Sequence, residues 1–175
     1  MTMTNRRSFI TGIKSTTLSS KEKKFLQKYK PWGVILFSRN IKSIKQTRLL
    51  TNQIKKIFKD KSYPIMIDQE GGRVNRLKKI FNTDSLTGEY FGKLYSKDIK
   101  KFNFYYKLFI KQTSFLLKSI GANINTLPIL DLRSKGSSNI IGDRSFSKNK
   151  KIVSKIGDIC INYFHKNKIA TIIKH

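Results

Sequence analysis

The sequence predicts an α/β fold in which about four parallel strands alternate with helices. Two apolar runs of strand length, GVILF at 33–37 and PIMID at 64–68, are rich in aliphatic residues. Between such runs, apolar residues recur at helical spacing. Strands that are apolar almost throughout are typical of parallel sheets covered on both faces. Two architectures satisfy this pattern: a doubly wound sheet and part of a (β/α)8 barrel.

The first half of the chain supplies two of these strands. After a polar start, a short helix over 20–29 leads into the GVILF strand. Ser43 is expected to cap the next helix, over 43–59, because its hydroxyl can accept a hydrogen bond from a free amide of the first turn. The second strand follows at 64–68, and the turn-rich segment NTDSLTGEY at 82–90 is expected to be a loop.

The second half begins with a long helix over 99–120, which Gly121 is expected to end. A strand over 124–132 is expected next, although Pro128 weakens it because proline cannot donate to a sheet ladder. The remaining elements are a loop over 133–146, a helix over 148–167 and a strand over 169–175.

The charge balance is strongly basic, with 37 Lys and Arg against 10 Asp and Glu and a formal net charge of +27. Such a balance is typical of proteins that bind nucleic acid or anionic membranes. Here, however, the lysines are spread along several helix faces, and no zinc-finger spacing or RNA-binding aromatic signature accompanies them. We therefore expect a solvated basic surface without a specific nucleic-acid partner.

Cysteine content and the N-terminus favour a cytoplasmic protein. The single cysteine, Cys160, excludes an internal disulfide, and its place in a helical pattern predicts a small core residue. Arg6 and Arg7 resemble the start of a twin-arginine signal, but a polar segment follows where an export signal needs an apolar one. No stretch approaches the roughly 18 apolar residues of a membrane span, and no membrane partner is expected.

Polar and charged side chains follow each predicted strand. They are Ser38, Arg39 and Asn40 after the first strand, Asp68, Gln69 and Glu70 after the second, Asp131, Asp143 and Arg144 after the third, and Lys174 and His175 at the end of the fourth. Parallel strands of one sheet end at the same edge, so these side chains are expected to converge there. Gly71 and Gly72 lack the surroundings of a phosphate loop and are expected to allow a sharp turn.

Four segments in the order WGVILFSRNI, PIMIDQEGGRVNRL, IGDRSF and IIKH resemble the N-terminal half of glycoside hydrolase family three. More narrowly, they resemble its cytoplasmic bacterial β-N-acetylglucosaminidases that recycle peptidoglycan. The resemblance runs from about Gly12 to His175 and implies the first half of a (β/α)8 barrel, about four of its eight strands. It also implies a retaining β-N-acetylhexosaminidase that needs neither metal nor organic cofactor.

The resemblance assigns sugar recognition to five residues of this chain. Asp68 matches the family aspartate that holds sugar hydroxyls, and Arg73 matches an arginine of the same motif. Arg144 matches a sugar-binding arginine, and Lys174 and His175 match the Lys-His pair that opens the family's KHFPGHG loop. The implied partner is a sugar or muropeptide that contains N-acetylglucosamine.

The family's acid/base histidine and nucleophilic aspartate lie beyond the KH of that loop, so no catalytic residue is expected within 1–175. The whole chain is interpreted as one incomplete family three domain that holds the sugar-recognition half. Three alternatives stay open: a glucoside-cleaving member of the family, an inactive fragment, and a basic module that binds nucleic acid or anionic glycan.

Overall fold

The computed structural model describes residues 5–133 and 139–175, and its strands form one parallel sheet. In this part of the chain the strands are β1 (Arg7–Gly12), β2 (Pro31–Leu36), β3 (Ile65–Ile67), β4 (Ile124–Asn125) and β5 (Ala170–Thr171). They lie side by side in sequence order, each paired in parallel with the next. A doubly wound sheet reverses its strand order, whereas a barrel sheet does not. The order therefore decides between the two predicted architectures in favour of a barrel portion.

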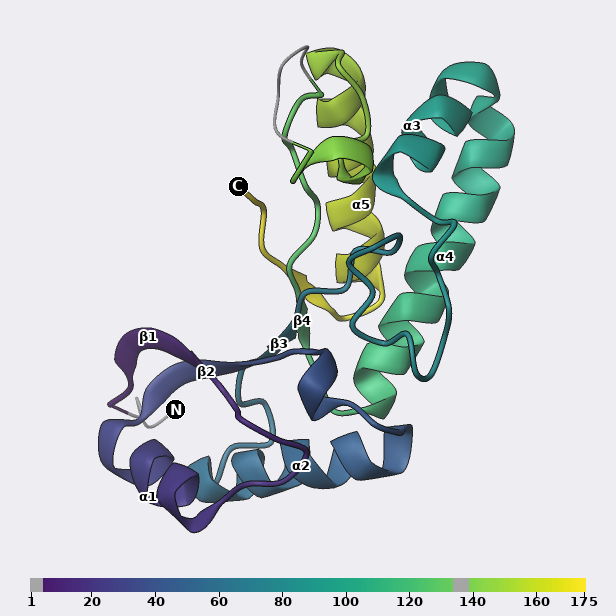
Figure 1. Ribbon diagram of the computed structural model, residues 1–175. Helices are drawn as coiled ribbons and strands as arrows, with labels where there is room; N and C mark the ends of the chain where they lie inside the picture. The colour runs from purple at the N-terminus through teal and green to yellow at the C-terminus, as the bar shows by residue number, and fades with distance from the viewer. Residues whose placement is uncertain (1–4, 134–138) are drawn as a thin grey trace.

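Every crossover between strands carries at least one helix (Figure 1). The helices are α1 (Ser20–Tyr29), α2 (Ile44–Phe58), α3 (Gly88–Lys97), α4 (Ile99–Ser119) and α5 (Lys150–Lys166), with single 3-10 turns η1 (Ser38–Asn40) and η2 (Gly142–Arg144). α1 and α2 lie at one end of the molecule, and α3, α4 and α5 stand beside one another at the other. The predicted alternation of strand and helix is confirmed.

Helix ends follow the sequence signals. The Ser43 hydroxyl accepts a hydrogen bond from the Gln46 amide at 3.2 Å, which confirms the predicted cap of α2. Gly121 follows α4 with a φ of +83°. A Cβ there would lie 2.4 Å from the Thr51 hydroxyl, so both the left-handed backbone and the close approach of α2 require glycine.

Two elements differ from the sequence-based expectation. β1 occupies the segment that was expected to be polar and irregular, and it covers the edge of β2. Its residues are exposed or half-buried, so no apolar run marks it. α3 begins within the expected loop over 82–90, where Thr87 caps it through the Tyr90 amide at 3.0 Å. Both elements depend on contacts that the local sequence pattern does not display.

The strand expected over 124–132 is much shorter in the structure. β4 ends at Asn125, and the only further pairing described is a bridge between Ile129 and Lys174. The expected loop over 133–146 lies partly outside the described residues, which omit 134–138. The 139–146 part of that loop contains η2.

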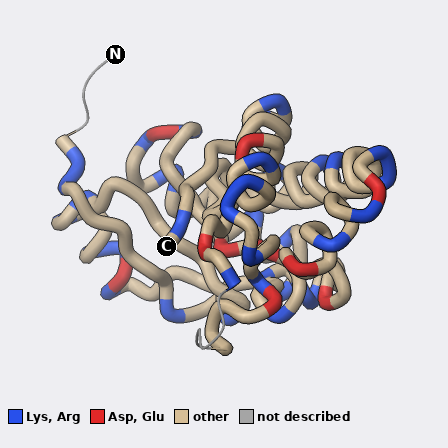
Figure 2. The backbone as a smooth tube through the Cα atoms, turned by 90° about the horizontal axis from the view of Figure 1, so that it is seen from above, with Lys and Arg blue, Asp and Glu red and all other residues tan. Residues whose placement is uncertain are grey.

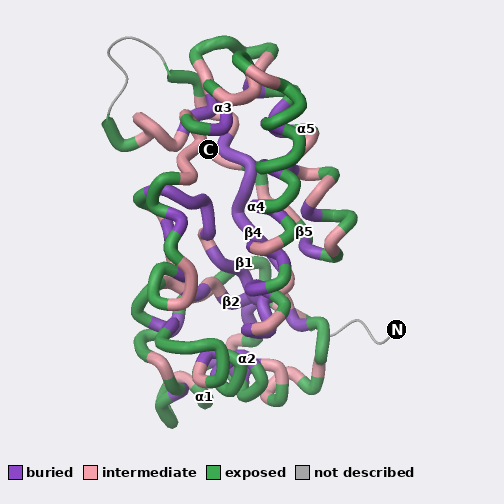
Figure 3. The backbone as a smooth tube through the Cα atoms, turned by 90° about the vertical axis from the view of Figure 1, so that its right-hand side faces the viewer, coloured by how far each residue is buried: buried purple, intermediate pink, exposed green. Residues whose placement is uncertain are grey.

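The core lies between the sheet and the inner faces of the helices, and buried positions run through the centre of the molecule (Figure 3). Cys160 is fully buried there, and burial raises the pKa of its thiol to about 12, which confirms a core residue. None of the described helices is both long and apolar enough to cross a membrane.

Candidate functional site

Asp68 directly follows β3 and collects three partners at the carboxyl end of the sheet. Its Oδ2 accepts a hydrogen bond from the Arg76 guanidinium at 2.8 Å, and its Oδ1 accepts one from the Thr126 hydroxyl at 2.6 Å. The Lys174 ammonium also donates to Oδ1. Burial would raise the pKa of Asp68, but the hydrogen bonds and the Lys174 charge outweigh it and lower the pKa from 3.8 to about 2.

Lys174 joins two carboxylates that lie two residues apart. Its Nζ lies 2.6 Å from Oε1 of Glu70 as well as in contact with Asp68. The main chain brings it there, because Lys174 pairs with Ile129 and its carbonyl accepts from the Leu130 amide at 2.9 Å. The extended segment after β5 therefore places a cation where β3 ends.

Glu70 is the most buried member of the group, with 4% of its side chain exposed. Arg144 donates two parallel hydrogen bonds to it, from Nε to Oε2 and from Nη2 to Oε1, both 2.8 Å long. The carboxylate of Glu70 raises the pKa of Arg144 further above its ordinary value. Glu70 thus stands between two cations contributed by distant parts of the chain.

A tight turn lets the chain leave this group. Gly71 and Gly72 have φ values of +93° and +55°. A Cβ on Gly71 would lie 2.3 Å from the Leu86 carbonyl oxygen, so only glycine fits. This explains the glycine pair of the sequence as a turn.

His175 lies at the rim of the group and is about half exposed. Its Nδ1 is 2.7 Å from Oδ2 of Asp131, and its Nε2 is 3.4 Å from Nη2 of Arg144. The structure therefore brings together Asp68, Arg144, Lys174 and His175 at one edge of the sheet.

Arg73 lies outside this group. Its Nε bonds to Asp143 at 3.0 Å, and its Nη2 donates to the carbonyls of Asn139, Ile140 and Ile141. These contacts tie the DQEGGRV turn to the segment that carries η2. Arg76, two residues beyond that motif, is the arginine that contacts Asp68.

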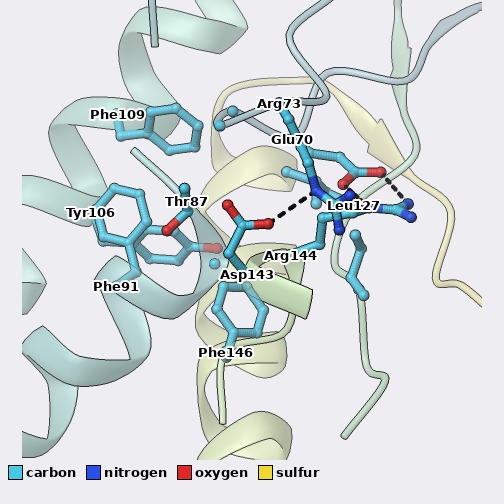
Figure 4. A pocket seen from close by; sticks show the side chains of 14 residues that line it. Glu70, Arg73, Thr87, Phe91, Tyr106, Phe109, Leu127, Asp143, Arg144 and Phe146 are labelled. Carbon is cyan, nitrogen blue, oxygen red and sulfur yellow. Dashed lines mark hydrogen bonds and ion pairs between the residues drawn. The ribbon is translucent and has the colours of Figure 1, made fainter. Parts of the chain in front are cut away.

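A small cavity borders the group (Figure 4). Phe91, Tyr106, Phe109 and Phe146 lie on its apolar side, and the Glu70–Arg144 and Arg73–Asp143 pairs lie on its polar side. Its volume of about 20 Å³ holds roughly one water molecule. A ligand of sugar size therefore does not fit inside this cavity.

The chemistry of the group suits a ligand rich in hydroxyls. Carboxylates accept hydrogen bonds, ammonium and guanidinium groups donate them, and a hydroxyl does both. Each such bond is charge-assisted and stronger than one between neutral groups. Within 5–133 and 139–175, no group of three or more His, Cys, Asp or Glu side chains is arranged to hold a metal ion.

Comparison with known proteins matches residues 8–175 to the glycosyl hydrolase family 3 N-terminal domain. The chain belongs to glycosyl hydrolase family 3. It is 34% identical to a beta-hexosaminidase of Hydrogenovibrio crunogenus over 167 residues, 93% of this chain and 45% of that protein. It is 28% identical to a beta-hexosaminidase of Thioalkalivibrio sulfidiphilus, with 93% and 46% covered.

Solved structures give the same relationship. NagZ from Neisseria gonorrhoeae superimposes with a TM-score of 0.86 at 27% identity, covering 97% of this chain and 49% of that one. NagZ in complex with N-trifluoroacetyl-D-glucosamine gives a TM-score of 0.87 at 26% identity, with 97% and 50% covered. The family 3 chain thus spans about half the length of these relatives.

Arg76 and Thr126 were missed as site residues by sequence reasoning, and Glu70 was noted without a role. Thr126 carries the same signal as Asp68, because it is a polar residue directly after a buried strand. Arg76 has no such signal, since it lies within a turn. Only its contact with Asp68 distinguishes it from Arg73.

The lowered pKa of Asp68 predicts a pH-dependent contribution to stability of the family 3 chain. The folded-state pKa of about 2 is below the ordinary 3.8, so the contribution is complete above pH 3.8 and is lost as pH falls through about 2. The shift corresponds to about 2 kcal/mol. In urea titrations, the difference in unfolding free energy between the parent and Asp68→Asn should be largest near neutral pH and shrink towards pH 2. A difference independent of pH would contradict this origin.

Glu70→Gln should destabilise the chain by about 3 kcal/mol, because it leaves Arg144 and Lys174 partly buried beside a neutral group. Asp84→Asn is the matched control, since it removes an exposed ion pair with Lys78 and should cost less than about 1 kcal/mol. Unfolding free energies from denaturant titration compare the two. Equal effects would mean that the Glu70 cluster is as solvent-screened as a surface pair.

Proposed function

We propose that this chain forms the sugar-binding half of a β-N-acetylhexosaminidase, which hydrolyses terminal β-N-acetylglucosaminyl residues of peptidoglycan fragments with retention. The observation that carries the proposal is the charged group at the carboxyl ends of β3 to β5, in a chain related to beta-hexosaminidases. The complex of NagZ with N-trifluoroacetyl-D-glucosamine supports an N-acylglucosamine as the ligand.

Four residues contact the sugar in this proposal. Asp68 accepts hydrogen bonds from two ring hydroxyls, and Arg144, Lys174 and His175 donate to the others. In the free protein the ion pairs keep these side chains in place. When the sugar binds, its hydroxyls replace part of that ion pairing. Arg76 and Thr126 fix the orientation of the Asp68 carboxylate through their hydrogen bonds to it.

Arg73 takes a different role from direct sugar contact. Its hydrogen bonds to three successive carbonyls support the turn that presents Arg144 to Glu70. In the proposal Arg73 positions Arg144 and does not touch the ligand.

In the proposal, bond cleavage belongs to residues in the half of the relatives that this chain does not cover. A retaining glycosidase needs a nucleophilic carboxylate and a general acid whose pKa is near the working pH. Asp68, with a pKa of about 2, is ionised at neutral pH and cannot donate a proton. Glu70 is held by two cations and faces away from solvent.

Hydrolysis by two protein side chains needs no metal and no organic cofactor. A single buried cysteine without a disulfide fits a reducing compartment, which supports the cytoplasm as the place of action.

N-acetylglucosamine should bind the 175-residue chain and shift the amide resonances near Asp68, Thr126 and Lys174 in NMR titrations. Asp68→Ala should weaken binding at least about tenfold, because it removes charge-assisted hydrogen bonds. Asp158→Ala, an exposed carboxylate on α5, is the matched control and should leave the affinity unchanged. Glucose that binds as tightly as N-acetylglucosamine would contradict selection for the N-acyl group.

The 175-residue chain should not hydrolyse a chromogenic N-acetylglucosaminide, because the Asp68 and Glu70 carboxylates are paired with Lys174 and Arg144 and neither is free to attack the sugar. A chain extended through the second half of its relatives should turn the substrate over. Turnover by the short chain that disappears in Asp68→Asn or Glu70→Gln would overturn the assignment of these residues to binding. If the extended chain is as inactive as the short one, the result would argue against the proposed β-N-acetylhexosaminidase activity.

A further inference from the structure

The charged residues within α2 and α4 are all basic, although Asp98, which caps α4, pairs with Lys101. The sequence of neither helix contains Asp or Glu. Their cations are Lys45, Arg48, Lys55 and Lys56 on α2, and Lys100, Lys101, Lys107, Lys111 and Lys118 on α4. Over the molecule as a whole, acidic residues are few and lie among the basic ones (Figure 2).

A stripe of large apolar side chains runs between these cations. Phe104, Leu108 and Phe115 of α4 are 66%, 52% and 60% exposed. Their spacing places them on one side of a helix about 30 Å long. Lys111, which is exposed, falls within the same stripe.

The stripe continues onto α2. Ile44 and Leu49, both exposed, line one groove with Phe115. The basic side chains of Lys45, Arg48 and Lys118 line that groove too. We call this surface the α2–α4 face: Ile44, Leu49, Phe104, Leu108 and Phe115 with the nine cations named above.

The α2–α4 face is not a surface that a neighbouring helix of the barrel ring would cover. α4 packs against α2, α3 and α5. Its inner residues Tyr106 and Phe109 are buried against the core. The stripe therefore points outward, away from both the sheet and the sugar site.

We propose that the α2–α4 face docks on the surface of an anionic lipid bilayer. Apolar side chains on a helix with a basic flank enter the headgroup region while the lysines pair with lipid phosphates. A second copy of the chain is a poor occupant, because it would bring nine cations against nine without a carboxylate from either helix. A nucleic acid would account for the lysines but not for the exposed apolar stripe.

This inference departs from the expectation that the chain has no membrane partner. That expectation rested on the lack of a spanning segment, and docking on a surface needs none. The proposal is also independent of sugar binding, which uses the charged group at the carboxyl ends of β3 to β5.

Sedimentation with lipid vesicles tests the proposal. The 175-residue chain should bind vesicles that contain about one quarter phosphatidylglycerol in phosphatidylcholine, and bind pure phosphatidylcholine much more weakly. Binding should fall steeply towards about 1 M salt, where the Debye length is about 3 Å. The triple variant Phe104→Ser, Leu108→Ser and Phe115→Ser should bind anionic vesicles at least about tenfold more weakly, because it removes the inserted apolar area.

A charge control separates docking from diffuse attraction. Lys23→Gln, Lys24→Gln and Lys28→Gln remove three exposed cations from α1 and should change binding less than about twofold. Circular dichroism should show that both triple variants fold. If the apolar triple variant does not fold, the single variant Phe104→Ser replaces it in the vesicle assay.

Three results would overturn the proposal. The first is undiminished binding by the apolar variant, and the second is an equal loss in the α1 variant, which would indicate charge alone. The third is self-association of the chain through Phe104 and Phe115, seen by sedimentation velocity, together with no vesicle binding.

Discussion

The Lys174 ammonium between the carboxylates of Asp68 and Glu70 is the interaction on which the site depends. Two carboxylates this close and this buried would repel each other and lose hydration without a cation between them. The cation comes from a position 106 residues beyond Asp68, so the group exists only when the segment after β5 lies beside the segment after β4. The site therefore forms only when the sheet has its native strand order.

The rest of the site follows from that constraint. Glu70 needs a second cation for its other oxygen, and Arg144 supplies it in a bidentate arrangement that sets the position of η2. The Gly71–Gly72 turn lets the chain leave Glu70 at once, and Arg73 then returns to hold the carbonyls just before Gly142. The charged side chains at the carboxyl ends of the strands are thus paired and oriented by one another.

Most of the few acidic residues are bound to cations around the site or serve at helix starts. Their distribution explains where the excess positive charge lies. Asp68, Glu70, Asp131 and Asp143 contact cations or His175 around the site, and Glu22 and Asp98 serve at helix starts. Few carboxylates remain for the outer surface, so the charged residues of α2 and α4 are all lysine or arginine. On α4 those lysines flank exposed phenylalanine and leucine, a combination that solvent exposure by itself does not favour.

The sequence by itself determined the alternation of strands and helices, the caps at Ser43 and Gly121, and the polar residues that follow the strands. Those features are encoded by neighbouring residues, through apolar periodicity and backbone conformation. The apolar pattern left a doubly wound sheet and a barrel open, the resemblance to glycoside hydrolase family three implied the barrel, and the strand order confirmed it. Only the tertiary structure decided that β1 and α3 form, and that Arg76 reaches Asp68 while Arg73 does not. β1 is a half-exposed edge strand held by pairing with β2, and α3 starts within turn residues, so neither leaves a local signal. The two arginines are equivalent in type and three positions apart, and the direction of each is set by the turn and by groups far along the chain.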